Sequence, residues 1–387
     1  MKTLNDYKWI CPAPFVDIHV HNTGEMKPCC VMDYSEQINE FKNIQNDSFY
    51  DYYNAESTKR LRDGMRNEND DEYVYGICEK CKQVEDLGNK SYRQIYIETF
   101  DKKEELEKII AEDIQPTFFN KFEFKPLVSN KCNLACNMCH SDWSSRYHAE
   151  AITLGEIEKK NTIISPDIND KAWNELPDIL SKLEEIKIVG GEPLFAEGTY
   201  KLIEMVPHPE KMKLKTITNG TIDPTRFIEL TKDFKSVKIN ISIEGTPKLT
   251  EYIRWPSKWV EIEKNYDKLK HHSKIKFVST INALNISNAP ELKEFMEKKY
   301  YNHIQNILVV NNEYSLSSIP PDIKDKYLNK LYSNKMIDLI KYLEQAEYNE
   351  DDMWKMLNHI KRRDNHRKTN LLNVLPEWKK YYENCSG

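Results

Sequence analysis

The sequence predicts an α/β fold, a partial (β/α)6 barrel of the TIM type, and three observations support this prediction. Between residues 122 and 310, short apolar runs alternate with amphipathic stretches, as strands and helices do in a parallel sheet. Six such units are fewer than the eight of a closed barrel. Of the 387 residues, 39% are hydrophobic and 30% charged, which is typical of folded globular chains.

Hydrophobic periodicity places the elements of this barrel. The expected strands cover residues 122–128, 186–189, 214–218, 237–243, 275–281 and 304–310. The expected helices between them cover residues 171–183, 200–206, 224–232, 259–271 and 289–299.

The regions on either side of the barrel have different patterns. Residues 15–21 alternate apolar and polar side chains and are followed by Asn-Thr-Gly, which predicts a hairpin whose second strand leads to Cys29. Helices are expected over 57–65 and 102–111, and the chain from Pro320 onward is expected to be helical. We therefore expect three parts, which cover residues 1–120, 121–312 and 313–387.

Composition excludes several classes of protein. With 56 basic and 62 acidic residues the net charge is −6, so a strongly basic nucleic-acid binder is disfavoured and nucleic acid is not expected as a partner. No apolar stretch reaches the ~18 residues of a membrane helix, and the N-terminus lacks the layout of a signal peptide. We expect a cytoplasmic protein without a membrane partner.

Two residue counts carry information about function. The chain has only 11 glycines, so each is expected to hold a position that needs one. Cytoplasmic proteins rarely keep disulfides, and grouped cysteines in such a chain indicate metal or redox chemistry. The nine cysteines are Cys11, Cys29, Cys30, Cys78, Cys81, Cys132, Cys136, Cys139 and Cys385.

The most informative motif is Cys-x3-Cys-x2-Cys, formed by Cys132, Cys136 and Cys139 directly after the first expected strand. One interpretation is a helix with small apolar side chains at positions i, i+4 and i+7. The other is an iron–sulfur site. Such clusters normally take four thiolates, so a compact trio leaves one iron open, as catalytic zinc sites keep one position free.

This motif, after the first strand of a βα array, resembles the radical S-adenosylmethionine (SAM) superfamily. The resemblance implies that the trio holds a [4Fe–4S] cluster whose open iron binds the amino and carboxyl groups of SAM. An electron from a flavodoxin- or ferredoxin-type donor then cleaves SAM to methionine and a 5′-deoxyadenosyl radical, which abstracts hydrogen from a substrate. Met138 stands where the family usually has an aromatic residue, and we expect it over the adenine.

Four further segments at expected strand ends resemble the same family. The run Gly190, Gly191, Glu192, Pro193 resembles its GGEP motif, which implies contact with the SAM amino group; a plain Gly-Gly turn is the alternative. The resemblance also implies contacts with the ribose, methionine and carboxylate parts of SAM, although solvated loop side chains are the alternative. The residues concerned are Asn219, Ser242, Glu244 and Arg254.

The second cysteine set resembles a twitch/SPASM auxiliary-cluster domain. The resemblance implies a second [4Fe–4S] cluster, although in most such enzymes this domain follows the barrel. A zinc ribbon is the alternative, since Cys-x2-Cys pairs are ordinary zinc ligands. The expected ligands are Cys11, Cys29, Cys78 and Cys81, whereas Cys30 and Cys385 are expected to be bystanders.

Other residues are assigned to the surface, with a functional alternative for each group. His19 and His21 are expected on a strand surface, with metal or substrate binding as the alternative. The basic residues 361–363, Arg367 and Lys368 are expected on a solvated helix face, with an acidic substrate or partner as the alternative. Ser91 and Arg93 are candidates for the active site.

The sequence therefore predicts a radical SAM enzyme that acts on a peptide or protein side chain, with a net oxidation or cross-link if the auxiliary cluster accepts an electron. The alternative keeps this chemistry on a small molecule, such as an amino sugar or a nucleotide. A more distant alternative is a zinc-binding interaction protein without enzymatic activity.

Overall fold

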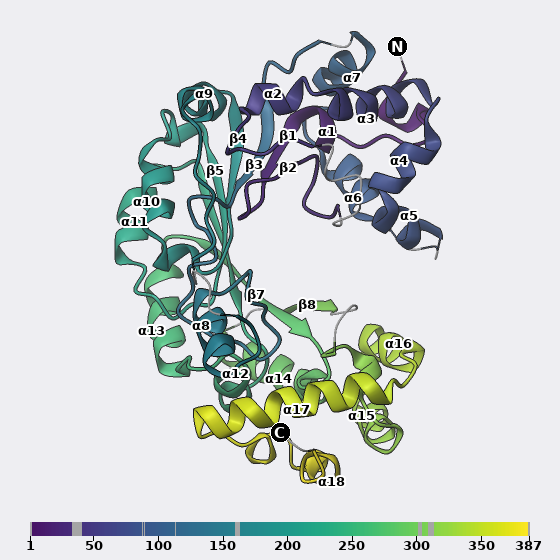
Figure 1. The fold of residues 1–387 in the computed structure, drawn as a ribbon, viewed down its shortest axis with the longest axis vertical. Coiled ribbons are helices and arrows are strands. Elements are labelled where there is room, and N and C mark those ends of the chain that lie inside the picture. The colour runs from purple at the N-terminus through teal and green to yellow at the C-terminus, as the bar shows by residue number, and fades with distance from the viewer. Residues whose placement is uncertain are drawn as a thin grey trace. The chain divides into compact units, whose positions relative to one another are not determined.

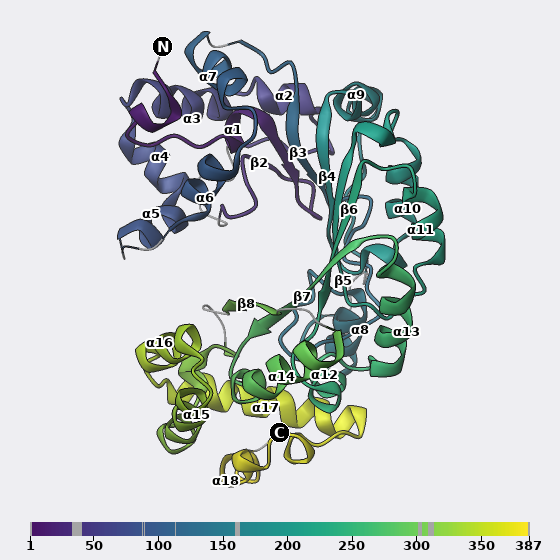
Figure 2. The ribbon, with the colours of Figure 1, turned by 180° about the vertical axis from the view of Figure 1, so that it is seen from behind.

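The chain folds into two compact units (Figures 1 and 2). The structure, a computed structural model, describes residues 2–32, 41–86, 88, 90–112, 114–158, 163–300, 304–308 (backbone alone) and 313–385. Unit 1 comprises Met1–Asn130, Ile163–Thr216 and Glu229–Val237. Unit 2 comprises Lys131–Thr162, Ile217–Ile228 and Lys238–Gly387.

The sheet of unit 1 has the strand order β2-β1-β3-β4-β5, and all its neighbouring strands are parallel except β1 and β2. The antiparallel β1–β2 pair confirms the predicted hairpin, and Gly24 occupies its turn with φ 98°. The parallel pairing of β1 with β3 was not predicted, and it joins the N-terminal segment to the barrel strands. The strands are β1 (Asp17–Val20), β2 (Met26–Lys27), β3 (Phe119–Phe124), β4 (Leu183–Ile188) and β5 (Lys213–Thr218).

Helices precede and follow these strands, and Figure 2 shows α9 and α10 alongside β4. Those expected over 57–65, 102–111, 171–183 and 200–206 are confirmed within a few residues, whereas α1 and α4–α6 were not predicted. The helices are α1 (Ala13–Val16), α2 (Phe49–Tyr53), α3 (Glu56–Asn67), α4 (Asp71–Ile77), α5 (Glu79–Asp86), α6 (Tyr92–Thr99), α7 (Lys103–Glu112), α9 (Asp170–Ser181) and α10 (Glu197–Glu204).

The two faces of this sheet differ in character because side chains alternate along each strand. One face is apolar and buried, and Phe49 of α2 packs edge-to-face on Phe122 there. The other face carries charged side chains. The parallel register aligns His19 with Glu123, and Glu123 with Lys187. An apolar face is needed for the core, so the charged face is the one available for chemistry.

Unit 2 contains the parallel strands β6 (Ser236–Ser242), β7 (Lys274–Ile281) and β8 (Ile304–Leu308). The expected strand 304–310 is confirmed to Leu308, and its last two residues lie outside the described part. The strand expected over 122–128 instead spans Phe119–Phe124, because residues 125–129 form a turn that ends on Ser129 at φ 55°. The helices of the barrel part are α8 (Ser145–Thr153), α11 (Thr225–Thr231), α12 (Pro247–Ile253), α13 (Trp259–Leu269) and α14 (Ala289–Tyr300).

The C-terminal extension is helical, as predicted. Its helices are α15 (Pro321–Ser333), α16 (Ile337–Gln345), α17 (Glu350–Arg367) and α18 (Lys379–Tyr382). They share one hydrophobic core with α12, in which Tyr252, Met356 and Trp378 are buried. The tail is therefore an integral part of unit 2.

Among the described residues, no helix has the length and apolar character that crossing a bilayer requires.

Candidate functional site

The three-cysteine segment is an irregular loop between β3 and α8, so the helical interpretation of the motif is wrong. Cys136 is buried and Cys132 and Cys139 are half-buried. Burial raises the pKa of the Cys139 thiol, and the neighbouring Cys136 and Cys132 raise it further. The loop thus gathers three thiols that repel one another when ionised, and a bound cation relieves this repulsion.

Tertiary hydrogen bonds fix the shape of this loop. The backbone N–H groups of Ala135 and Asn137 donate to the carbonyl oxygens of Trp255 and Ile253, at 2.7 and 2.8 Å. At the other side, the Cys132 N–H donates to Ser145 Oγ at 3.1 Å. These contacts hold the loop in a fixed shape without the repetitive hydrogen bonds of a helix.

Helix α17, which belongs to the C-terminal extension, holds the three-cysteine loop in place. Arg367 donates to the Ala135 carbonyl oxygen at 2.7 Å and to the side chain of Asn137. Its guanidinium also pairs with Glu150 of α8 at 2.6 Å. Arg363, 1% exposed, pairs in a bidentate manner with Glu156, both contacts being 2.8 Å. The expected solvated helix face is therefore wrong for these two arginines, because the buried Glu150 of α8 and the half-buried Glu156 after that helix lie opposite them.

A buried ion pair lies beside Cys136. Arg254 donates through Nε and Nη2 to Glu244 Oε1, at 3.1 and 2.5 Å, and its Nη1 lies 3.9 Å from Cys136 Sγ. Glu244 is fully buried, and its other oxygen accepts from Thr280 N at 2.9 Å and Asn285 Nδ2 at 3.1 Å. Burial raises the pKa of Glu244, and the Arg254 guanidinium opposes that shift. Oε1 of Glu244 thus holds Arg254, while Oε2 is itself held by Thr280 and Asn285.

An amide network links the loop to the segment after β5. Asn219 Nδ2 donates to Asn133 Oδ1 at 2.9 Å, and Thr221 Oγ1 donates to Asn219 Oδ1 at 2.7 Å. Asn133 and Asn285 were missed in the sequence, because single amides without a spacing pattern carry no signal. The half-buried Ser242 ends β6, and the half-buried Met138 packs against the C-terminal core.

The glycine pair of unit 1 follows β4. Gly190 has φ 154°, and a Cβ atom there would lie 2.5 Å from Val128 Cγ1 and 2.8 Å from the Ser129 carbonyl oxygen. The expectation that a scarce glycine marks close backbone approach is confirmed at this position. The buried Glu192 caps the short turn that begins at Pro193, since its Oε1 accepts from Leu194 N at 3.1 Å.

Substitution of Gly190 by alanine is expected to destabilise the protein by roughly 2–5 kcal/mol, because it combines backbone strain with a steric clash. Gly155→Ala is the matched control: its φ of 70° is strained, yet no atom lies within 4 Å of the added Cβ. We expect the control to lose about 1–2 kcal/mol from left-handed backbone alone. Urea unfolding of both variants gives the comparison, and equal losses would contradict the clash.

The second cysteine set gathers in unit 1. Cys11, Cys29, Cys78 and Cys81 line one cavity, whose other walls include Met32 and Leu61. Burial raises the pKa of Cys78 to about 12, and burial with the neighbouring thiols raises the pKa of Cys11 and Cys29. Four thiols in an apolar cavity suit a centre that supplies positive charge, which an iron–sulfur cluster or zinc ion does.

Arg93 and Ser91 hold together the segments that line this cavity. Both donate to Glu85 of α5, Arg93 through Nη2 at 2.6 Å. Arg93 Nη1 also donates to the Ile10 carbonyl oxygen at 3.0 Å, next to Cys11, and its guanidinium lies 4.0 Å from the Trp9 ring centre. These residues join the Cys11 segment to the helix that carries Cys81, so their structural role lies at the second cysteine set.

Comparisons with known proteins give two family matches and several distant relatives. Residues 127–298 match the radical SAM superfamily and residues 11–82 match the iron–sulfur cluster-binding SPASM domain. A probable GTP 3′,8-cyclase of Methanocaldococcus jannaschii is 24% identical over 233 residues, which are 56% of this chain and 70% of that protein. The GTP 3′,8-cyclase of Alkaliphilus oremlandii is 27% identical over 121 residues, and the chain spans only 33% of its length.

The solved structures that resemble this chain share a lower sequence identity with it. SuiB of Streptococcus suis bound to S-adenosylmethionine aligns over 72% of this chain and 61% of its own, with 14% identity and a TM-score of 0.35. The protein anSMEcpe with bound AdoMet aligns over 59% of this chain and 61% of its own, with 18% identity and a TM-score of 0.40.

Proposed function

Because the chain belongs to the radical SAM superfamily and carries an N-terminal SPASM domain, we propose that Cys132, Cys136 and Cys139 hold the SAM-binding [4Fe–4S] cluster. What supports this proposal is that the three cysteines lie on one irregular loop, held by tertiary hydrogen bonds, within the region that matches the radical SAM superfamily. A cluster with three protein thiolates leaves one iron for SAM, whereas four thiolates would close it.

The charged side chains beside the three-cysteine loop suit a site that holds a cluster and SAM. When bound, the cluster and SAM supply a 5′-deoxyadenosyl radical by reductive cleavage, with an electron from a flavodoxin- or ferredoxin-type donor. Arg254 places a cation beside Cys136 and offsets the negative charge of the thiolates. Glu244 keeps that cation in place from a site without water contact. The protein's contribution is therefore binding, orientation and electrostatics.

The residues proposed to contact SAM differ in the hydrogen bonds that their side chains already make. We assign Arg254 to the SAM carboxylate and Glu244 to positioning Arg254, since both Glu244 oxygens are engaged. Glu192, whose Oε1 accepts from Leu194 N, is the candidate for the SAM amino group that the family resemblance implies. The remaining proposed contacts are Met138, Gly190, Gly191, Pro193, Asn219 and Ser242.

The second cysteine set is proposed to hold an auxiliary [4Fe–4S] cluster through Cys11, Cys29, Cys78 and Cys81. Such a centre can accept an electron from a substrate and turn hydrogen abstraction into a net oxidation. The four thiols in one apolar cavity support a closed centre, and zinc is the alternative that metal analysis distinguishes.

Cys78→Ala is expected to lower the iron content from about eight to about four per chain, because one of two four-iron clusters is lost. SAM cleavage should continue without product formation. Cys385→Ser is the control, since Cys385 Sγ contacts the Leu357 carbonyl oxygen in the C-terminal core and should change neither iron nor cleavage. If the wild type holds only four irons and Cys78→Ala removes a zinc ion, the auxiliary centre is zinc.

We propose a peptide or protein side chain as the substrate, in keeping with the resemblance to auxiliary-cluster enzymes. A nucleotide is the second candidate, and the relatives named GTP 3′,8-cyclase favour it. Deuterated candidates distinguish the two: the true substrate transfers deuterium to 5′-deoxyadenosine. Deuterated peptides and deuterated GTP are the first candidates to compare. Transfer from GTP alone would move the assignment to the small molecule.

A further inference from the structure

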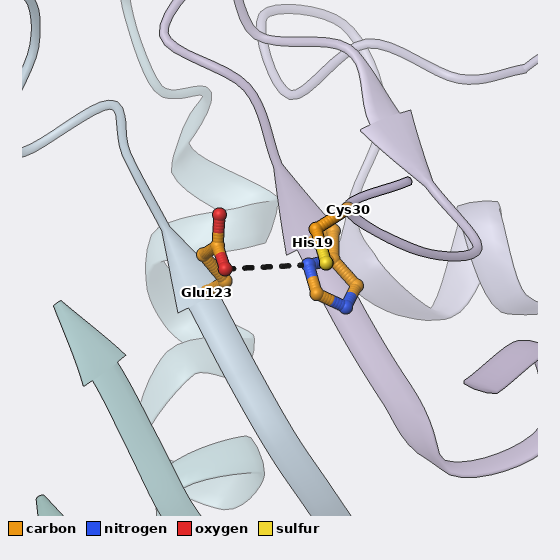
Figure 3. Close-up of side chains that lie close together, drawn as sticks. All are labelled: His19, Cys30 and Glu123. Atoms are coloured by element: carbon orange, nitrogen blue, oxygen red, sulfur yellow. Dashed lines mark ion pairs between the residues drawn. The ribbon is translucent and has the colours of Figure 1, made fainter. Parts of the chain in front are cut away.

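A third group of metal-binding side chains lies on the charged face of the unit 1 sheet. His19 comes from β1, Glu123 from β3 and Cys30 from the segment after β2 (Figure 3). One ligand atom from each residue lies within 4.8 Å of the other two. The parallel register sets His19 directly opposite Glu123, and the Cys30 sulfur lies beside the His19 ring. Three elements thus converge on one point outside both cysteine sets.

His19 is the unusual member of this group. It is 4% exposed, and neither ring nitrogen has a hydrogen-bond partner among the described residues. Its Nδ1 lies 3.8 Å from Glu123 Oε2 and its Nε2 lies 3.9 Å from Asp17 Oδ2. A buried imidazole with both nitrogens unsatisfied is costly, which points to a group that His19 binds when the site is complete.

The 3.8 Å separation discriminates among the groups that could lie between His19 and Glu123. A direct hydrogen bond requires about 2.7–3.2 Å. One bridging water, with two legs of about 2.8 Å at the tetrahedral angle, requires about 4.6 Å. Two ligand atoms at about 2.0–2.1 Å from one zinc ion lie about 3.3 Å apart at the tetrahedral angle, and a separation of about 3.8 Å corresponds to an angle of about 136°. The observed distance is too long for a direct bond and too short for a bridging water, and a closure of about 0.5 Å brings the two atoms to the spacing of ligands on a tetrahedral zinc ion.

We propose that His19 Nδ1, Cys30 Sγ and Glu123 Oε2 bind a zinc ion. A nitrogen, sulfur and oxygen donor set is one that zinc accepts, and three protein ligands leave a fourth position for water or a substrate atom. Asp17 stands behind the other ring nitrogen as the carboxylate of a carboxylate–histidine–metal arrangement. Tyr96 holds Asp17 through a 2.6 Å hydrogen bond. Binding releases the Cys30 proton and involves no change of oxidation state.

Two lysines compete with the ion for Glu123. Lys187 Nζ lies 2.6 Å from Oε2 and Lys125 Nζ lies 3.1 Å from Glu123 Oε1. Zinc must replace the Lys187 ammonium on Oε2, so this lysine weakens zinc binding. Lys187→Met should therefore bind zinc more tightly than the wild type. A purely structural ion pair or a site for anions predicts no such gain.

The test uses the full chain with its iron–sulfur clusters reconstituted anaerobically, equilibrated with zinc chloride, desalted and analysed for zinc and iron. We expect about one zinc per chain in the wild type and in the control His21→Ala, whose ring instead bonds Thr23 at 2.7 Å. His19→Ala and Glu123→Gln should lose that zinc at unchanged iron content. Cobalt in place of zinc should show thiolate charge-transfer absorption that Cys30→Ser abolishes.

Three results would overturn the proposal: no zinc retained by the iron-loaded wild type, equal zinc in His19→Ala, or no affinity gain in Lys187→Met. Cys30→Ser could also lose iron, because Cys29 is its neighbour. In that event His19→Ala and Glu123→Gln decide the outcome, since their iron content reports whether the protein remains intact.

Discussion

Cys136→Ala is expected to reduce the formation of 5′-deoxyadenosine to the level seen without reductant. Cys136 is the buried middle thiol of the trio and lies 3.9 Å from the Arg254 guanidinium. Two remaining thiolates cannot hold a four-iron cluster that normally takes three or four. The iron content should therefore fall by about four per chain. Anaerobic reconstitution, chromatography of the nucleoside product and iron analysis provide the measurement.

The matched control for this loss is Cys385→Ser, which removes an equally buried thiol that contacts the Leu357 carbonyl oxygen in the C-terminal core. It should keep the wild-type iron content and rate of SAM cleavage. If Cys136→Ala cleaved SAM normally at full iron content, the trio would not be the cluster site.

Arg367→Ala is expected to cause the largest loss of stability, about 3–5 kcal/mol, because it removes the hydrogen-bonded cation from a buried carboxylate. Its partner Glu150 is buried, and the remaining cation is Arg363, whose Nε lies 3.4 Å from Glu150 without a hydrogen bond while its two Nη atoms bond Glu156. The Ala135 carbonyl oxygen also loses its donor. We expect a lower urea midpoint and faster loss of iron from the three-cysteine site.

Arg362→Ala is the control on the same helix. Arg362 is 43% exposed and lies 3.6 Å from Glu156, so an exposed pair of this kind should contribute about 0–1 kcal/mol. Arg367→Lys should recover part of the stability, since lysine keeps the charge but not the planar fork. Equal losses in Arg362→Ala and Arg367→Ala would mean that α17 presents a solvated basic face after all.

Local patterns predicted much of the fold and the cysteine sets. The strands β4 to β7 and the helices between them follow hydrophobic periodicity, which depends on neighbouring residues. The three-cysteine loop is equally local, since its ligands lie within eight residues. Such features are readable because the residues that make them are close in the chain.

Long-range contacts could not be predicted in the same way. Arg367 meets Glu150 across 217 residues, and its own helix has the polar composition of a solvated surface. The pairing of β1 with β3 also joins segments about 100 residues apart, and no turn signal marks it. Single amide residues such as Asn285 belong to no motif with a defined spacing. The roles of these residues could be assigned only from the tertiary structure, which shows their partners.

The most direct measurement is metal analysis of the wild-type protein after anaerobic reconstitution, followed by assay for 5′-deoxyadenosine with SAM and a reductant. We expect about eight irons per chain, from two four-iron clusters, and 5′-deoxyadenosine that depends on reductant. A protein loaded with iron that forms no 5′-deoxyadenosine, or a colourless protein with zinc in both cysteine sets, would contradict the proposed function.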